Sequence, residues 1–154
     1  MIKGQVLLYP VVNAPGTHTE LYHGAQLSKY RVAPKHARVL RAVIQFMVDM
    51  VANMHDPELL EAVYLQGSIS AESIYLAPLT DDFHGLPPTL LVYGEHDMLA
   101  AENTAYAKKA AANGADCKTV IYEGTLHGFA DRIGVLPQAE DCVQEIAAWI
   151  STIK

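Results

Sequence analysis

Thr89–Gly94, which reads TLLVYG, is the stretch that decides the fold class. It is a short run of strand-forming, mostly apolar residues without alternation, and it ends at a glycine. Such a run is typical of a strand buried on both faces, as in a parallel sheet. Val6–Val12 is a second continuous apolar run, and Lys118–Tyr122 is a third strand candidate that Glu123-Gly124 ends. We therefore predict strands near residues 4–12, 89–94 and 118–123.

Helical patterns separate these strands. Apolar residues recur at steps of three and four over roughly residues 36–54, and polar residues occupy the opposite face. Residues 101–113 and 138–152 also read as helices, and Glu58–Gln66 as a shorter one. Alternating strands and helices predict an α/β fold of three layers, a parallel sheet with helices on both faces. We expect one domain over residues 1–154, with a helical insert at about 18–85 between the first two strands.

Composition excludes several classes of protein. Lys plus Arg is 11 and Asp plus Glu is 17, so the formal charge of −6 argues against a nucleic-acid partner. The longest apolar run, Val6–Val12, is far shorter than the ~20 residues of a membrane-spanning helix. Cys117 and Cys142 form neither a disulfide framework nor a C-x-x-C motif. We expect a cytoplasmic protein with reduced thiols and without a cofactor or metal.

Two polar residues follow neighbouring predicted strands. Asp97 lies in the loop after residues 89–94, and His127 lies in the loop after residues 118–123. Loops at the carboxyl edge of a parallel sheet form its binding sites, so a carboxylate there can orient an imidazole. Asp97 can instead cap the next helix, and His127 can be an ordinary loop histidine. His96, next to Asp97, could suggest a metal site, but no ligand spacing such as H-x-x-x-H or C-x-x-C supports one.

Four segments carry a resemblance to a known family. LPPTLLVYGEHDML at 86–99 and YEGTLHGF at 122–129 resemble the acid and histidine segments of hormone-sensitive-lipase-like esterases, which have the α/β-hydrolase fold. GQVLLYP at 4–10 is similar to the strand after the family's nucleophile turn, and Ala77-Pro78-Leu79 to the element before its acid strand. The resemblance covers nearly all of the chain. It implies only the C-terminal half of that fold, its last three strands without the N-terminal half.

The resemblance assigns Asp97 as the acid and His127 as the base of a catalytic triad. No G-x-S-x-G nucleophile turn and no His-Gly-Gly-Gly loop for the oxyanion occur in the sequence. The implied function is carboxylic-ester hydrolysis on a small ester substrate, by a truncated chain that is inactive unless another chain complements it. The alternative is a non-catalytic α/β module for self-association or partner binding. Without the strand that lies beside it in the family, Val6–Val12 would be an open edge strand. We therefore expect a homo-oligomer or a complementing chain at this edge.

A geometric expectation tests this resemblance. The Asp97 carboxylate should lie roughly 2.7–3.2 Å from Nδ1 of His127, with the other imidazole nitrogen directed toward the edge beside Val6–Val12. Three methionines, Met47, Met50 and Met54, lie at helical spacing, which favours a stripe of core residues. The alternative comes from the resemblance, because the family's insert helps to form the wall of the substrate pocket. The acidic residues expected to be solvated are Glu102, Glu123 and Asp131.

Overall fold

The computed structural model describes residues 2–14, 33–54, 56–70 and 73–153 of the chain. Its elements, in chain order, are β1 (Gln5–Leu8), α1 (Pro34–Met54), α2 (Pro57–Leu60), the π-helix η3 (Glu61–Leu65), the 3₁₀ helix η4 (Pro78–Thr80), β2 (Thr89–Gly94), α3 (Ala100–Ala112), β3 (Cys117–Tyr122), the 3₁₀ helix η5 (Phe129–Asp131) and α4 (Pro137–Thr152). The predicted order of strands and helices is confirmed. Within the described ranges, every helix is too short or too polar to cross a lipid bilayer.

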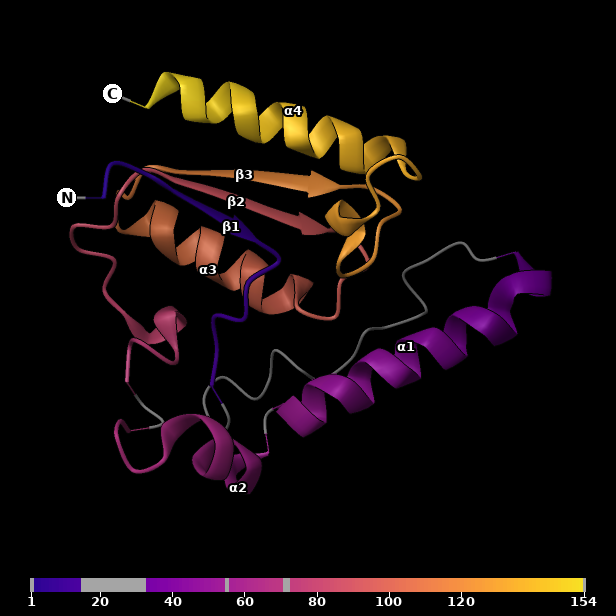
Figure 1. The fold of residues 1–154 in the computed structure, drawn as a ribbon, viewed down its shortest axis with the longest axis horizontal. Coiled ribbons are helices and arrows are strands. Elements are labelled where there is room, and N and C mark those ends of the chain that lie inside the picture. The colour runs from indigo at the N-terminus through magenta and orange to yellow at the C-terminus, as the bar shows by residue number, and fades with distance from the viewer. Residues whose placement is uncertain (1, 15–32, 55, 71–72, 154) are drawn as a thin grey trace.

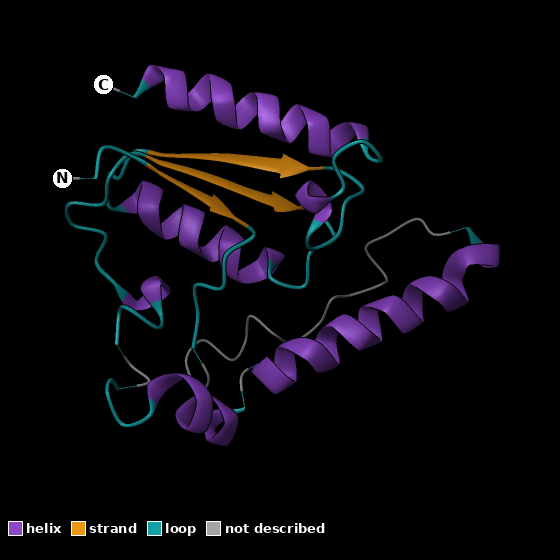
Figure 2. Ribbon diagram, viewed as in Figure 1, coloured by secondary structure: helices purple, strands orange, loops and turns teal. Residues whose placement is uncertain are grey.

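The three strands form one parallel sheet in the order β1-β2-β3. Leu7 pairs with Leu91 across the first ladder, and Val92 pairs with Val120 across the second. Figures 1 and 2 show the sheet between two helices, with α3 on one face and α4 on the other. Because β2 is central and covered on both faces, all six of its residues are buried. The predicted three-layer α/β fold with a parallel sheet is therefore confirmed.

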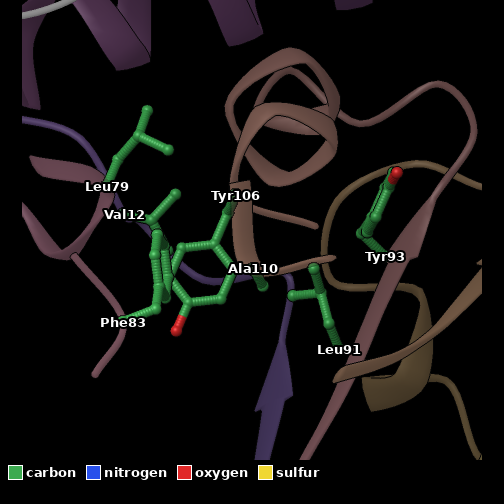
Figure 3. Packing of buried hydrophobic residues seen from close by; sticks show 7 residues of the cluster. All are labelled: Val12, Leu79, Phe83, Leu91, Tyr93, Tyr106 and Ala110. Atoms are coloured by element: carbon green, nitrogen blue, oxygen red, sulfur yellow. The ribbon is translucent and has the colours of Figure 1, made fainter. Parts of the chain in front are cut away.

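Alternate residues of β2 supply two separate cores. Leu91 and Tyr93 pack on the α3 side, in a cluster where Phe83 and Tyr106 stack edge to face at 4.7 Å between ring centroids (Figure 3). Leu90 and Val92 belong to the cluster on the α4 side, together with Cys142, which is fully buried. Consecutive strand residues point to opposite faces, and so an unbroken apolar run serves both cores.

The first strand is shorter than predicted. β1 ends at Leu8, because Tyr9 has a φ of 38° in the left-handed region and Pro10 has no N–H to pair. After the strand ends, the chain is exposed at Val11 and buried again from Val12 to Ala14. Val12 is 2% exposed, and its carbonyl accepts the N–H of Leu79, which ties the segment after β1 to η4. The apolar run up to Val12 thus combines a strand with a partly buried connection.

The helix α1 of the insert contributes little to either core, whereas Leu79 and Phe83 near the end of the insert are buried in the cluster on the α3 side. α1 extends away from the three layers (Figure 1), and Val39 and Phe46 on it are 65% and 68% exposed. Of the three methionines predicted to form a core stripe, Met50 is only half-buried, and none of the described side chains of α1 is buried. The side chains of Met47 and Met54 lie outside the described part of the chain.

Candidate active site

Asp97 lies in the loop between β2 and α3. Its side chain is fully buried, and its Oδ1 accepts the N–H of Leu99, the residue just before α3. The carbonyl of Asp97 also accepts the N–H of Ala100. The carboxylate thus bonds to the turn before the helix and does not cap it, since Leu99 is the N-cap residue and no side chain caps the helix. These contacts hold the carboxylate in one orientation.

His127 reaches the same carboxylate from the loop after β3. Its Nδ1 lies 3.1 Å from Oδ1 and 3.0 Å from Oδ2 of Asp97, within the predicted distance. The hydrogen bond to Asp97 raises the pKa of His127 above its ordinary value; partial burial opposes this, and the charges of Asp97 and Asp131 add to it. The imidazole is 28% exposed. Among the residues that the structure describes, none hydrogen-bonds to its Nε2.

Backbone hydrogen bonds hold the two loops together. The N–H of Glu95 donates to the carbonyl of Tyr122 at 3.0 Å, and the N–H of His96 donates to the carbonyl of Thr125 at 2.9 Å. The N–H of Gly124 donates a hydrogen bond of 2.9 Å to the side-chain Oε2 of Glu95. These bonds continue the pairing of β2 and β3 past the ends of the strands. Asp97 and His127 therefore meet because parallel neighbours deliver both loops to one edge of the sheet.

Gly94 lets the histidine loop approach the acid strand. A Cβ at this position would lie 2.7 Å from both the carbonyl oxygen and the Oγ1 of Thr125, and 3.0 Å from the carbonyl oxygen of Leu126. Real Cβ atoms essentially never approach other atoms so closely. The absence of a side chain at Gly94 is thus a condition for the observed position of the loop that carries His127.

Tyr9 is a site residue that sequence reasoning missed. Its ring stacks against the imidazole of His127 at 4.8 Å between centroids, and its hydroxyl donates to Oδ1 of Asp131 at 3.0 Å. Burial raises the pKa of Tyr9 to about 12, with smaller contributions from the hydrogen bond to Asp131 and nearby negative charge. Asp131 is exposed as predicted. The available signal was the place of Tyr9, directly after the first strand, at the carboxyl edge of the sheet.

Glu102 contradicts the prediction of a solvated side chain. It is 1% exposed, and its Oε1 accepts the N–H of Val12 at 2.7 Å. The next residue, Asn103, is fully buried and donates to the carbonyl of Pro10 at 3.1 Å. The first turn of α3 therefore holds the segment after β1, whose N–H and carbonyl groups are buried and need partners.

The described residues show neither a metal cluster nor a serine placed as a nucleophile. In those ranges, no three His, Cys, Asp or Glu side chains are grouped so that they could hold a metal ion. Ser68, in the insert, donates its hydroxyl to the carbonyl of Leu65. The geometry therefore provides an acid–base pair at the sheet edge, with one imidazole nitrogen available to a reacting group.

Comparisons with known proteins agree with the fold. A family model described as alpha/beta hydrolase fold matches residues 1–131. The chain is 34% identical to a probable carboxylesterase 16 of Arabidopsis thaliana over 67 residues. This alignment covers 42% of this chain and 15% of that protein. It resembles the solved structure of a hyperthermophilic esterase from the archaeon Pyrobaculum calidifontis, with a TM-score of 0.67 and 27% identity over 98% of this chain and 43% of that one.

A thermostable carboxylesterase, EstE1, cloned from a metagenomic library gives a similar result, with a TM-score of 0.69 and 26% identity over 99% of this chain and 46% of that one. The chain thus spans less than half the length of these relatives. The family match itself extends over most of the chain and includes both Asp97 and His127. The chain belongs to the alpha/beta hydrolase fold family, as its sequence motifs predicted.

Proposed function

We propose that Asp97 and His127 are the acid and the base of a serine carboxylic-ester hydrolase. The observation that carries this proposal is the contact of 3.0 Å between Nδ1 of His127 and the buried carboxylate of Asp97. The carboxylate keeps the proton on Nδ1, so Nε2 is free to accept the proton of an attacking hydroxyl. Nε2 then returns that proton to the leaving alcohol, while Asp97 stabilises the transient imidazolium.

The serine and the oxyanion donors would come from residues outside this sequence, which has no G-x-S-x-G turn. The position of β1 supports complementation at its outer edge. Gln5 and Tyr9 donate their N–H groups to the carbonyls of Pro88 and Val92, toward β2. The alternate residues, Val6 and Leu8, therefore direct their backbone groups away from β2. A further parallel strand there would bring its carboxyl end to the same edge as the imidazole of His127.

An assay of the purified 154-residue chain with short p-nitrophenyl esters tests the proposal. We expect a background rate and no labelling by a fluorophosphonate, because losing the nucleophile costs on the order of 10⁶ in rate in a serine hydrolase with a triad. Stoichiometric labelling of one serine would show that the chain has its own nucleophile.

A second arm of the assay adds a polypeptide that carries the G-x-S-x-G half of a related esterase. Hydrolysis should appear with the wild-type chain and be lost with His127→Ala. The matched control is His84→Ala, which changes an exposed histidine distant in sequence from the pair. Binding of the added half without hydrolysis would instead favour the non-catalytic module.

A further inference from the structure

Tyr9 combines an uncommon backbone conformation with contacts to the histidine loop. Its φ of 38° lies in the left-handed region, which residues other than glycine seldom adopt. Its N–H donates to the carbonyl of Val92 at 2.6 Å, so the backbone is held at the end of β1. This conformation accompanies a ring that lies against His127 and Phe129, with centroids at 4.8 Å and 6.1 Å.

The hydroxyl of Tyr9 ties the ring to the segment that follows His127. It donates to Asp131 in η5, and Phe129, the other ring partner, begins the same 3₁₀ helix. In Figure 1, η5 lies beside the arrowheads of the strands, at the edge where Asp97 and His127 meet. Hydrogen bonds to the β2 loop anchor the residues before His127. Tyr9, directly after β1, anchors the residues that follow His127.

We propose that Tyr9 is a positioning residue, which holds the imidazole of His127 in the orientation that places Nδ1 on Asp97. This inference rests on the proposed function, to which it adds a residue that acts through the base. A general base must keep its accepting nitrogen within hydrogen-bond reach of the hydroxyl that it deprotonates. The ring contact limits rotation of the imidazole, and the bond to Asp131 fixes the ring.

The charges around the imidazole give the proposal a measurable consequence. The groups that act on the proton affinity of His127 are Asp97, in direct contact, and Asp131, which Tyr9 holds nearby. Tyr9 itself stays neutral below its raised pKa of about 12, and so it donates to Asp131 across the working pH range. Removing the hydroxyl releases Asp131 toward solvent, and the pKa of His127 should then fall.

The test is an NMR titration of His127 in the full 154-residue chain. Tyr9→Phe should lower the pKa of His127, and Tyr9→Leu, which also removes the ring, should in addition broaden or abolish the Nδ1–H resonance. Asp131→Asn should shift the pKa in the same direction as Tyr9→Phe, and the double variant should add little further, because both changes remove one interaction. A merely structural role for Tyr9 would leave these signals unchanged in a folded variant.

The matched control is Tyr122→Phe, which removes a tyrosine–carboxylate hydrogen bond of 2.8 Å to Asp141. We expect the titration of His127 to be unaffected by it. The proposal is wrong if Tyr9→Phe titrates like the wild type, or if Tyr122→Phe produces the same shift. Failure of the ester-complementation assay, with the Tyr9 effects intact, would reject only the proposed function.

Discussion

Gly94→Ala should separate the two loops of the candidate site. An alanine Cβ would lie 2.7 Å from the carbonyl oxygen of Thr125, whereas ordinary van der Waals contact begins at 3.4 Å. The loop would have to retreat by about 0.7 Å, the difference between these distances. Both obstructing groups of Thr125 are fixed, since its carbonyl accepts from His96 and its Oγ1 donates to Tyr122. Strain of this kind costs about 1–3 kcal/mol.

Urea unfolding of Gly94→Ala measures this cost, and an NMR spectrum reports on the Nδ1–H of His127. A loss of 1 kcal/mol corresponds to a fall in Tm of about 2–4 °C in a chain of this size. We also expect a weaker or exchange-broadened Nδ1–H resonance, because His127 lies two residues after Thr125. The φ of Gly94 is outside the left-handed region, so the alanine backbone itself adds no strain.

Gly4→Ala is the matched control. Its φ is also outside the left-handed region, and its new Cβ would approach side-chain atoms, Cη2 of Trp149 at 3.0 Å and Cδ1 of Ile153 at 3.3 Å, instead of a backbone atom. We expect its free energy of unfolding to change by less than about 1 kcal/mol, since reduced freedom of the unfolded chain offsets a small repacking. If Gly94→Ala is as stable as Gly4→Ala and keeps the Nδ1–H resonance, the close approach does not restrict the loop.

Three further predictions concern charge, burial and assembly. The folded pKa of His127 is raised above 6.5, so its protonation stabilises the fold fully below that pH, and the effect is lost as pH rises through the folded value. Asp97→Asn should abolish that dependence in urea unfolding measured between pH ~5 and ~9. Glu102→Ala should cost about 1–3 kcal/mol by leaving the buried N–H of Val12 without its acceptor, whereas Glu102→Gln, which keeps an oxygen, should cost less. Sedimentation at tens of micromolar should show an oligomer that covers the Val6–Val12 edge, and a strict monomer would contradict this expectation.

The core of the sheet and the position of the acid–base pair could be predicted from sequence. Thr89–Gly94 is the predicted strand without any change of boundary, because its unbroken apolar character reflects burial on both faces. Alternation of strands and helices requires parallel strands, and parallel strands place their following loops at one edge. That Asp97 and His127 would meet therefore followed from their positions in the chain.

Other features depended on contacts between segments far apart in sequence. Glu102 has the local pattern of an exposed helix residue, yet it is buried because Val12, 90 positions earlier, donates an N–H to it. The apolar stripe on α1 predicted burial, but periodicity does not specify which surface a helix packs against, and the described side chains there are not buried.

The sequence by itself determined the fold class, the order of the strands and the meeting of Asp97 with His127, because these depend on local hydrophobic patterns and on connectivity. Only the tertiary structure decided that Tyr9 stacks on His127 and that Gly94 admits the loop beside it. The physical reason is that each of these depends on the distance between atoms of different segments. Such distances are set by how whole elements pack, and no local pattern of residues encodes them.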